Sequence, residues 1–545
     1  MKKRMLALAM AGAMALGLLS GCGGGQQGGN ESQAPEAATR DLTVPSTSTL
    51  STLDSTLAAN SADMVLIRSV CEGLYRDSAD GIILAQAEKD EVSEDGLTHT
   101  FTIRSDAKWS NGEAVTAYDF EYAWKRLADP NTGAEYAYML ETAGIKNAGA
   151  VITGELPVDE LGVSATDEKT LVVECETYVP YFNDLLINPY FFPLNEEFVT
   201  SMGDQHGMTK ENVLYNGVFT VSDWEMGSDT VVLSKNAGYY DQAVSNLDTL
   251  TYQTITETQT GVMAYEGGDL DVLSISGDII DQYRDSEDLN FQVTATLFYL
   301  QPNLSNEYLA NENLRLAMAY AIDKQAICDD ILKNGSGPAD FIVVNHFAPN
   351  DENVYFRDVA NQTYLSHNLE TAQEYWAKAC EELGTSSISL ELLYDDSDGM
   401  SNIAQYLQAT LQENLPGLTI SLQVQPKKNR LELMGQGEFD FALTRWGTDY
   451  NDPSDFLNLF ITGASYNYGG YSSEVYDGLI DKANGVDIQD TDARFADFIE
   501  AEATILNEAA IIPLYEVSNA YLIKPNVHVD FTVNSGYMYQ YANMD

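Results

Sequence analysis

Apolar and polar positions repeat with two different periods along the chain, and the two patterns alternate from one end to the other. Residues 98–104 and 167–173 alternate strictly, as half-buried β-strands do. Apolar residues recur every three or four positions in longer stretches that predict amphipathic helices, namely residues 118–127, 314–332, 370–383, 403–415 and 495–506. Strands and helices interleaved in this way predict α/β layers rather than an all-β sandwich.

The N-terminal residues form a targeting pattern. A short cationic stretch precedes an apolar run at residues 5–19, which is too short to cross roughly 30 Å of hydrocarbon and is typical of a signal peptide. The sequence Leu19-Ser20-Gly21-Cys22 resembles the bacterial lipobox, in which the cysteine is acylated. We therefore expect a lipoprotein signal peptide at residues 1–21, a lipid on Cys22 and a flexible, Gly- and Gln-rich tether at residues 22–39. The alternative is a secretory peptide with an incidental cysteine.

Charge narrows the classes of function. The 545 residues include 83 Asp or Glu and 28 Lys or Arg, for a net charge of -55, so few cations are available to neutralise a polyanion and we expect no nucleic-acid partner. The chain is 44% hydrophobic with 32 tyrosines, which is the composition of a protein with a core and not of a disordered chain. Five cysteines in this length do not form a disulfide scaffold.

Motifs for catalysis and metal binding are absent from the sequence. Its five histidines are widely spaced, and it has no zinc motif, nucleophile elbow, phosphate loop or dinucleotide loop. The stretch 395–399 looks briefly like a calcium loop, but Tyr394 and Gln405 would fall at the first and last ligand positions. A turn that begins a helix is the better interpretation. We expect no enzyme activity, no metal and no cofactor.

Four stretches of the chain carry a family resemblance. They are similar to the family 5 bacterial extracellular solute-binding proteins of ABC importers, particularly the oligopeptide-binding proteins. The stretches are E-D-G-L-T-H-T-F-T-I-R at 94–104 with K-W-S-N-G at 108–112; Y-N-G-V-F at 215–219 with N-A-G-Y-Y at 236–240; N-L-R-L-A at 313–317 with Y-A-I-D-K at 320–324; and G-E-F-D-F at 437–441 with W-G-T-D-Y-N-D-P at 446–453.

The resemblance implies an α/β fold of the two-lobed periplasmic-binding-protein kind, with a hinge and an extra subdomain on lobe I. The corresponding boundaries place lobe I at residues 40–71, 195–295 and 519–545, the inserted subdomain at 72–194 and lobe II at 296–518. A discontinuous lobe I agrees with the lack of a long Gly-, Pro- or Ser-rich linker after residue 40.

The resemblance also implies a binding site. A receptor for peptides of many sequences must bind the backbone and the terminal ammonium, which needs a fixed carboxylate once it is desolvated. Asp449 matches the family position that pairs with the ligand's α-amino group, and Tyr450 and Asn451 belong to the same turn. Trp446 would provide a flat apolar wall, and Tyr136 matches a residue on the opposite side. The ordinary alternatives are a capping role for Asp449 and core packing for the two rings.

Two departures from relatives leave recognition of the ligand's carboxylate open. Some relatives carry an arginine three residues before the tryptophan, where this chain has Leu443, and another has a tryptophan where this chain has Lys427. Because cations are scarce, Lys427 and Arg445, together with Lys428 and Arg430, are candidate carboxylate contacts. Their ordinary alternative is surface or salt-bridging use.

The expected protein is a monomeric, lipid-anchored binding component of an ABC importer on the outer face of the cell membrane, which is the periplasmic side if the source has an outer membrane. Its partners would be peptides, the permease and, through the lipid, the membrane. Three alternatives remain: the same fold with an oligosaccharide, metal chelate or opine as ligand; a surface receptor or chaperone-like protein; and a hydrolase.

Overall fold

The computed structural model describes residues 39–350, 354–397, 399–533 and 535–545. The predicted signal peptide at residues 1–21, the predicted lipid site Cys22 and all but the last residue of the predicted tether lie outside this part of the chain. No helix among the described residues is long and apolar enough to cross a membrane.

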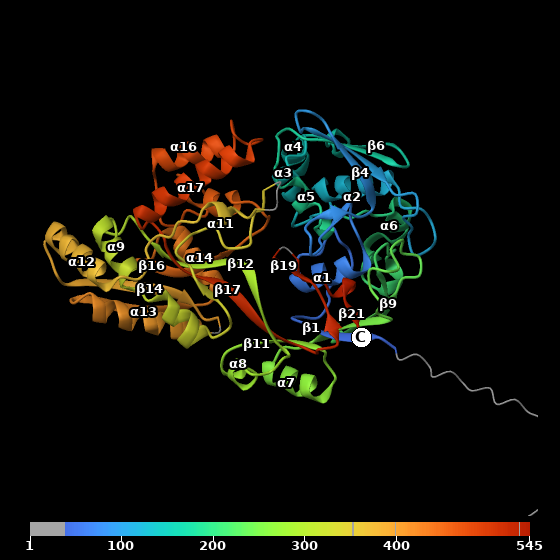
Figure 1. Cartoon of the computed structure of the whole chain (residues 1–545). Coiled ribbons are helices and arrows are strands. Elements are labelled where there is room, and N and C mark those ends of the chain that lie inside the picture. Colours follow the sequence, from blue (N-terminus) through green and yellow to red (C-terminus); the bar gives the residue numbers. More distant parts are fainter. Residues whose placement is uncertain (1–38, 351–353, 398, 534) are drawn as a thin grey trace, which may run out of the picture. The chain divides into compact units, whose positions relative to one another are not determined.

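A four-stranded sheet carries the start of the described chain. Its order is β1 (Asp41–Ser46), β10 (Thr249–Thr254), β9 (Thr230–Lys235) and β8 (Phe219–Asp223). β1 pairs with β10 in parallel, and the other neighbours are antiparallel. These strands share one hydrophobic core with helix α1 (Ser61–Val70) and with residues 527–542, so that segments far apart in the sequence fold together (Figure 1).

A separate antiparallel sheet organises a second core, formed by residues 74–199. Its order is β4 (Ala87–Val92), β5 (Thr98–Ile103), β7 (Thr170–Glu174) and β6 (Val163–Asp167), and helix α2 (Ala117–Ala128) packs against it. β5 buries every second residue, which confirms the strand predicted at 98–104. The strand predicted at 167–173 is confirmed over residues 170–173 as β7, but its predicted start is wrong, because Asp167 ends strand β6. The Lys169 N–H donates to the Asp167 carboxylate at 2.8 Å, and the chain turns there into a hairpin.

The third sheet has seven strands and the largest core. Its order is β11 (Val272–Ile275), β17 (Ile512–Ile523), β12 (Leu289–Pro302), β16 (Phe441–Gly447), β14 (Ile388–Asp395) and β15 (Leu418–Gln425), with β13 (Gly337–Pro338) paired to β17. β14 runs parallel to both of its neighbours, and the other pairs are antiparallel. The α/β layers expected from the sequence are therefore present.

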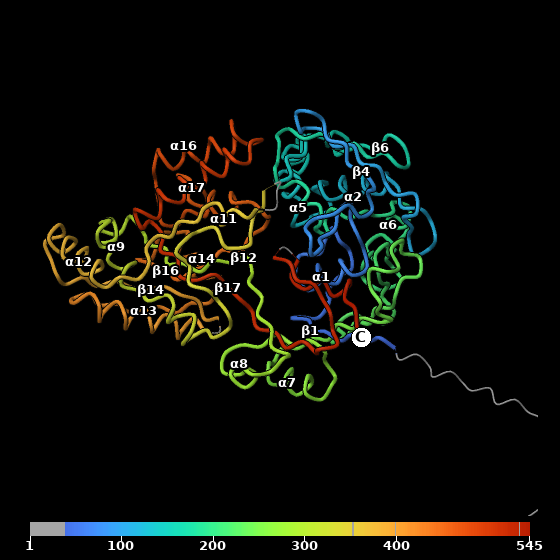
Figure 2. The backbone as a smooth tube through the Cα atoms, viewed as in Figure 1, coloured from blue at the N-terminus to red at the C-terminus, as the bar shows by residue number. Residues whose placement is uncertain are grey.

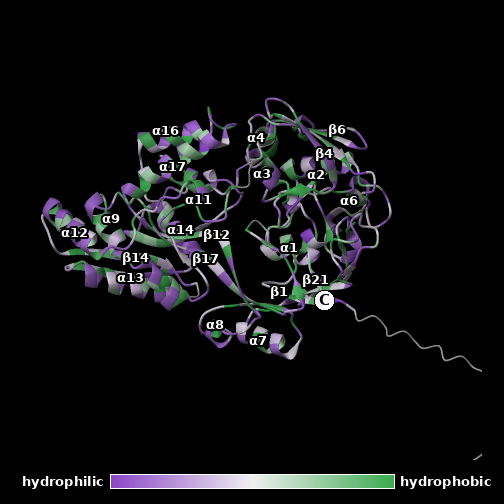
Figure 3. Cartoon of the chain, viewed as in Figure 1, coloured by the Kyte–Doolittle hydropathy of each residue, from purple (hydrophilic) through white to green (hydrophobic). Residues whose placement is uncertain are grey.

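Most of the predicted helices are confirmed. The helices α2, α12 (Leu369–Leu383), α13 (Met400–Asn414) and α17 (Thr491–Asn507) match four of the periodic stretches. α12 ends at Gly384, whose φ of 67° suits glycine. In Figure 3, α12 and α13 carry both hydrophilic and hydrophobic residues along their length, as amphipathic helices do.

The continuous helix predicted at 314–332 is wrong. Helix α9 (Glu312–Ala321) ends, and Asp323 caps a new turn, α10 (Lys324–Ala326), by accepting the Ala326 N–H. The chain then widens into a π-helical turn, Ile327–Leu332. Apolar spacing continues across the break, so the periodicity does not mark it.

Strands β12 and β17 run side by side and belong to two cores (Figure 2). At one end, Ala520 and Leu522 lie in the small core under helix α7 (Thr258–Gly267). At the other end, Leu297 and Leu514 lie in the large core. The register shifts between Val293 and Leu297, and such a bulge interrupts the ladder and lets a strand bend.

The four cysteines of the described chain carry free thiols. Cys71, Cys175 and Cys328 are buried, and burial raises the pKa of each thiol to about 12. Cys380 is half-buried beside the apolar face of α12. The three buried thiols are therefore core side chains without a cross-link.

A buried ion pair fastens residues 342–360 to helix α17. Glu502 is 1% exposed and accepts the N–H groups of Ile342 and Val343 at 2.8 and 3.0 Å. It also accepts two guanidinium hydrogen bonds from Arg357, at 2.9 and 2.6 Å. Both carboxylate oxygens are thus engaged.

Replacing Glu502 by Gln is expected to lower the free energy of unfolding by about 3–5 kcal/mol at neutral pH, because Arg357 would be left buried without a countercharge. Urea unfolding followed by circular dichroism measures this. The matched control is Glu174→Gln, which breaks the exposed pair with Lys146 and is expected to cost less than about 1 kcal/mol. Equal losses in the two variants would contradict the role assigned to Glu502.

Candidate functional site

The turn after strand β16 is held in place by one carboxylate. Asp455, in helix α15 (Ser454–Leu457), accepts the indole N–H of Trp446 at 3.1 Å. It also accepts the backbone N–H groups of Asp449 and Tyr450 at 2.5 and 3.0 Å. Asp455 is 5% exposed, and burial followed by the nearby Asp449 charge raises its pKa to about 7. These three bonds fix the direction in which Asp449 leaves the strand.

The two residues after Tyr450 also have internal partners. Asp452 accepts two hydrogen bonds from the buried Arg494 of α17, at 2.5 and 2.8 Å. Asn451 accepts the Ala348 N–H at 2.7 Å, so its predicted place in the site coincides with a structural bond to the 345–349 loop. The turn is therefore tied to α17 on one side and to this loop on the other.

Asp449 is the residue of the turn whose carboxylate is not used internally. Among the described residues, no Lys, Arg or His lies within ion-pair distance of it. Its side chain is exposed, yet the protein surrounding it desolvates the carboxyl and raises its pKa above the ordinary value for Asp. Its charge contributes to raising the pKa of Tyr136, Tyr138 and Tyr190, after burial, so these three hydroxyls lie within range of that charge.

Aromatic rings form the walls near Asp449. Tyr136 stacks on Tyr190 with ring centroids 5.1 Å apart and on Tyr138 at 6.0 Å. From the other side, Trp446 meets Tyr466 at 4.9 Å with the rings inclined by 61°. Of the two predicted rings, Tyr136 lies within range of the Asp449 charge, and Trp446 is bonded to Asp455, the residue that holds the Asp449 backbone. Tyr138, Tyr190 and Tyr466 were not predicted, because no motif distinguishes them among the 32 tyrosines of the sequence.

Tyr450 faces a different neighbour. Its ring stacks on Tyr181 with centroids 3.8 Å apart and planes inclined by 13°, and it packs against the core of residues 74–199. Burial raises its pKa well above the usual range. Tyr450 thus joins the turn to that core, and its ring surface is largely covered.

The predicted cation group divides into two parts. Lys427 and Lys428 are exposed at the start of helix α14 (Lys427–Gln436). Arg430 and Arg445 both pair with Asp395, at 3.3 and 3.0 Å. Burial would raise the pKa of Asp395, but the Ser397 hydroxyl and the two guanidinium groups lower it below the usual value. Two guanidinium groups share one carboxylate, so this cluster carries a net positive charge. The Arg445 side chain is 26% exposed.

The stretch at 395–399 is the helix-initiating turn that the sequence predicted. Asp395 accepts the Ser397 N–H, and Gly399, with a φ of 77°, immediately precedes α13. In the part of the chain that the structure describes, no group of three or more His, Cys, Asp and Glu is arranged to hold a metal ion.

A cavity of about 590 Å³ adjoins the turn. Asn451 lines it together with Asp77, His346 and residues 291–293 of strand β12. The volume is in the range of small-molecule and peptide side-chain sites. The arrangement can hold a cation on a carboxylate, with flat rings and open space beside it.

Stability should depend on pH through Asp455. Its pKa of about 7 in the folded protein exceeds the ordinary value near 3.9, so the folded state takes up a proton that the unfolded chain does not bind. This contribution is present at low pH and is lost as the pH rises through about 7. When the pH is lowered from about 7.5 to 5, the free energy of unfolding of the wild type, measured in urea, should rise by on the order of 2 kcal/mol relative to that of Asp455→Asn. If the free energies of unfolding of the two proteins changed in parallel with pH, titration of Asp455 near pH 7 would be excluded.

Comparisons with known proteins agree with the fold. The dipeptide-binding protein of Lactococcus lactis subsp. cremoris is 33% identical over 494 residues, covering 88% of this chain and 89% of the relative. The dipeptide-binding protein DppE of Bacillus subtilis is 32% identical, with 93% and 94% covered. The solved structure of Listeria monocytogenes OppA bound to peptide superposes with a TM-score of 0.71 at 33% identity, covering 93% of this chain and 99% of that one.

Listeria monocytogenes OppA and the unliganded open form of the periplasmic murein tripeptide-binding protein MppA have the two-lobed periplasmic-binding-protein fold. MppA superposes with a TM-score of 0.78 at 28% identity, covering 93% of this chain and 96% of that one. The predicted fold class is therefore confirmed. The model of the bacterial extracellular solute-binding proteins, family 5 (middle region), matches residues 81–468. The chain belongs to family 5 of the bacterial extracellular solute-binding proteins.

Proposed function

We propose that this protein captures oligopeptides between two lobes and delivers them to the permease of an ABC importer. The observation that carries the proposal is the Asp449 carboxylate, which has no cationic partner among the described residues and lies among tyrosine rings. The names of the relatives, a dipeptide-binding protein and a peptide-bound OppA, support a peptide as the ligand.

The ligand's ammonium is the group that Asp449 suits. Removing an ammonium from water costs several kcal/mol unless a carboxylate accepts its hydrogen bonds. Asp455 holds the Asp449 backbone in position, so the carboxylate is oriented before ligand arrives. Desolvation has already raised the pKa of Asp449, and a bound cation would offset that penalty. The site is in this sense prepared for a positive charge.

The rings around Asp449 provide contact without demanding one sequence. Tyr136, Tyr138 and Tyr190 form one stack, and Trp446 with Tyr466 forms another. Aromatic faces accept aliphatic, aromatic and cationic side chains alike. Lys427, Arg445, Tyr450 and Asn451 complete the proposed site at its edges, although Arg445, Tyr450 and Asn451 also have structural partners.

Closure of the lobes would occur at strands β12 and β17. We place lobe I at residues 40–71, 195–295 and 519–545, the inserted subdomain at 72–194 and lobe II at 296–518. The bulge between Val293 and Leu297 supports a hinge there, because few side chains of either core lie at that point. Closure needs a ligand that contacts the closed state better than the open one, which an ammonium held by Asp449 would provide.

The proposal includes attachment to the membrane through a lipid on Cys22, with residues 22–39 as a tether after removal of residues 1–21. The lipobox-like sequence supports it. The protein would act as a monomer on the outer face of the cell membrane, or on the periplasmic side where an outer membrane is present. No covalent chemistry, metal or cofactor is proposed, because the family consists of solute-binding proteins.

Calorimetry with a peptide and its N-acetylated form tests the role of Asp449. The free peptide should bind at least about tenfold more tightly than the acetylated one, and Asp449→Asn should remove most of that difference. The matched control is Asp204→Asn, which removes an exposed carboxylate outside the turn and should leave the difference in affinity between the two peptides unchanged. Equal affinity of wild type for both forms would reject the assignment. Binding of an oligosaccharide without any peptide binding would favour the non-peptide alternative.

Phase separation in a cloud-point detergent tests the lipid anchor. The protein from membranes of an expressing bacterium should enter the detergent phase, because a thioether-linked diacylglycerol adds a large apolar surface. Cys22→Ser should stay in the aqueous phase, and Cys380→Ser, which changes a half-buried thiol elsewhere, should behave like the wild type. Detergent partitioning of Cys22→Ser would show that the anchor, if any, is not on this residue.

A further inference from the structure

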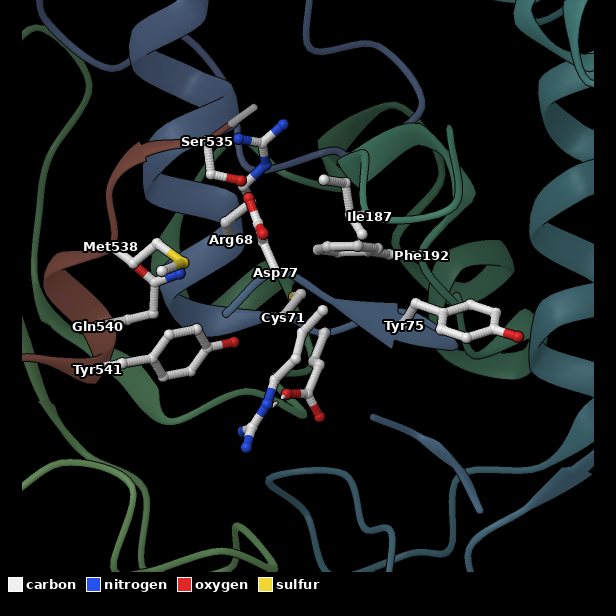
Figure 4. A pocket seen from close by; sticks show the side chains of 12 residues that line it. Arg68, Cys71, Tyr75, Asp77, Ile187, Phe192, Ser535, Met538, Gln540 and Tyr541 are labelled. Atoms are coloured by element: carbon white, nitrogen blue, oxygen red, sulfur yellow. Dashed lines mark ion pairs between the residues drawn. The ribbon is translucent and has the colours of Figure 1, made fainter. Parts of the chain in front are cut away.

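A small cavity lies between helix α1, strand β2 (Tyr75–Arg76) and the C-terminal segment (Figure 4). Its volume of about 20 Å³ is room for one water molecule. Arg68 of α1, Asp77, Ser535 and Gln540 are among its lining residues. In Figure 4 the Arg68 side chain extends toward Ser535 and Asp77.

The Arg68 guanidinium is only partly satisfied. One nitrogen, Nη2, donates to the Asn188 side-chain oxygen at 2.8 Å, whereas the buried Nε has no acceptor. Across the described residues, no carboxylate lies within ion-pair distance of Arg68. Asp77 is close enough to influence it, but the Asp77 carboxylate accepts the Ser78 N–H and the Thr532 hydroxyl. Burial lowers the pKa of Arg68, as expected for a cation without a full set of partners.

Other buried or half-buried arginines of the described chain are compensated. Four pair with carboxylates, namely Arg126 with Asp54, Arg357 with Glu502, Arg430 with Asp395 and Arg494 with Asp452. Arg315 donates to four backbone carbonyl oxygens instead. In a chain with 83 acidic and 28 basic residues, an arginine that lacks both kinds of partner is unusual. Its unused donors have the planar geometry that suits a carboxylate.

Arg68 lies close to the site around Asp449. Its partner Asn188 precedes Tyr190 by two residues, and the Tyr190 ring stacks on Tyr136 at 5.1 Å. The charges of Arg68 and Asp449 both act on the Tyr190 hydroxyl, in opposite directions. In addition, Asp77 lines both the Arg68 cavity and the 590 Å³ cavity beside Asn451. An uncompensated cation and an unpaired carboxylate therefore both act on the Tyr190 hydroxyl, and Asp77 connects the Arg68 cavity to the cavity beside the turn.

We propose that Arg68 recognises a carboxylate of the bound peptide, directly or through the one water for which its cavity has room, while Asp449 holds the ammonium. This inference rests on the proposed peptide-binding function. It makes the protein selective for peptides with a free C-terminal carboxylate, and for lengths that let both charged ends reach their partners.

The test is calorimetry of the full chain with alanine peptides of two to five residues and with their C-terminal amides. The wild type should bind its preferred free-acid peptide about tenfold more tightly than the amide of the same length. Arg68→Gln should reduce that ratio to less than about twofold, with the loss confined to the free acid, and Arg68→Lys should keep part of it because the charge remains. The matched control Arg284→Gln, on an exposed arginine paired with Asp281, should keep the full ratio.

The outcomes separate this inference from the function on which it rests. Equal binding of acids and amides by the wild type, or an unchanged ratio in a folded Arg68→Gln protein, overturns the role of Arg68 and leaves peptide binding intact. If Arg445→Gln loses the preference for the free acid over the amide and Arg68→Gln keeps it, the peptide carboxylate is bound by Arg445, and the role of Arg68 is again overturned. Failure of the wild type to bind any of these peptides, with or without the amide, rejects both proposals. Thermal unfolding of each variant identifies any that do not fold, and Arg68→Lys then carries the test.

Discussion

The candidate site depends on the Asp455 carboxylate. Its three hydrogen bonds, from the Trp446 indole and from two backbone N–H groups, determine where the turn goes after strand β16. Asp452 and Asn451 then anchor the far side of the turn to α17 and to the 345–349 loop. The Asp449 backbone takes part in this anchoring through its N–H, but its carboxylate does not. A buried acid that organises backbone donors thus leaves a second acid available for a ligand.

The charge of the chain has a different meaning inside the protein than on its surface. A net charge of -55 opposes association with other acidic molecules and keeps the surface hydrated. In the interior, the scarce arginines are distributed so that most have a countercharge, as with Arg494 and Asp452. Asp449 and Arg68 have no such countercharge within the described part of the chain, and the charges of both act on the Tyr190 hydroxyl. The departures from pairing are more informative about function than the total charge.

Local patterns predicted much of the fold, and non-local pairing explains what they missed. Helix α12 was predicted to within one residue because its apolar stripe ends at Gly384. The break at Asp323 was missed because a capping acid can replace a helical residue without disturbing the apolar spacing. Asp449 was predicted as a site residue because it lies in the W-G-T-D-Y-N-D-P stretch that resembles the family. The pairing of Arg445 with Asp395 requires β16 to lie beside β14, and the gathering of Tyr138, Tyr190 and Tyr466 requires the folded chain; neither has a signal in a single sequence.

The rings near Asp449 also have an entropic consequence. Tyrosine and tryptophan each have two side-chain torsions, so they present a large contact area while losing little conformational freedom on binding, and the stacks at Tyr136 and Trp446 restrict them already. Antibody combining sites use the same residues for the same reason. A surface of this kind accommodates unlike side chains at similar free energy. The protein would then distinguish ligands less by the identity of their side chains than by the distance between their charged ends.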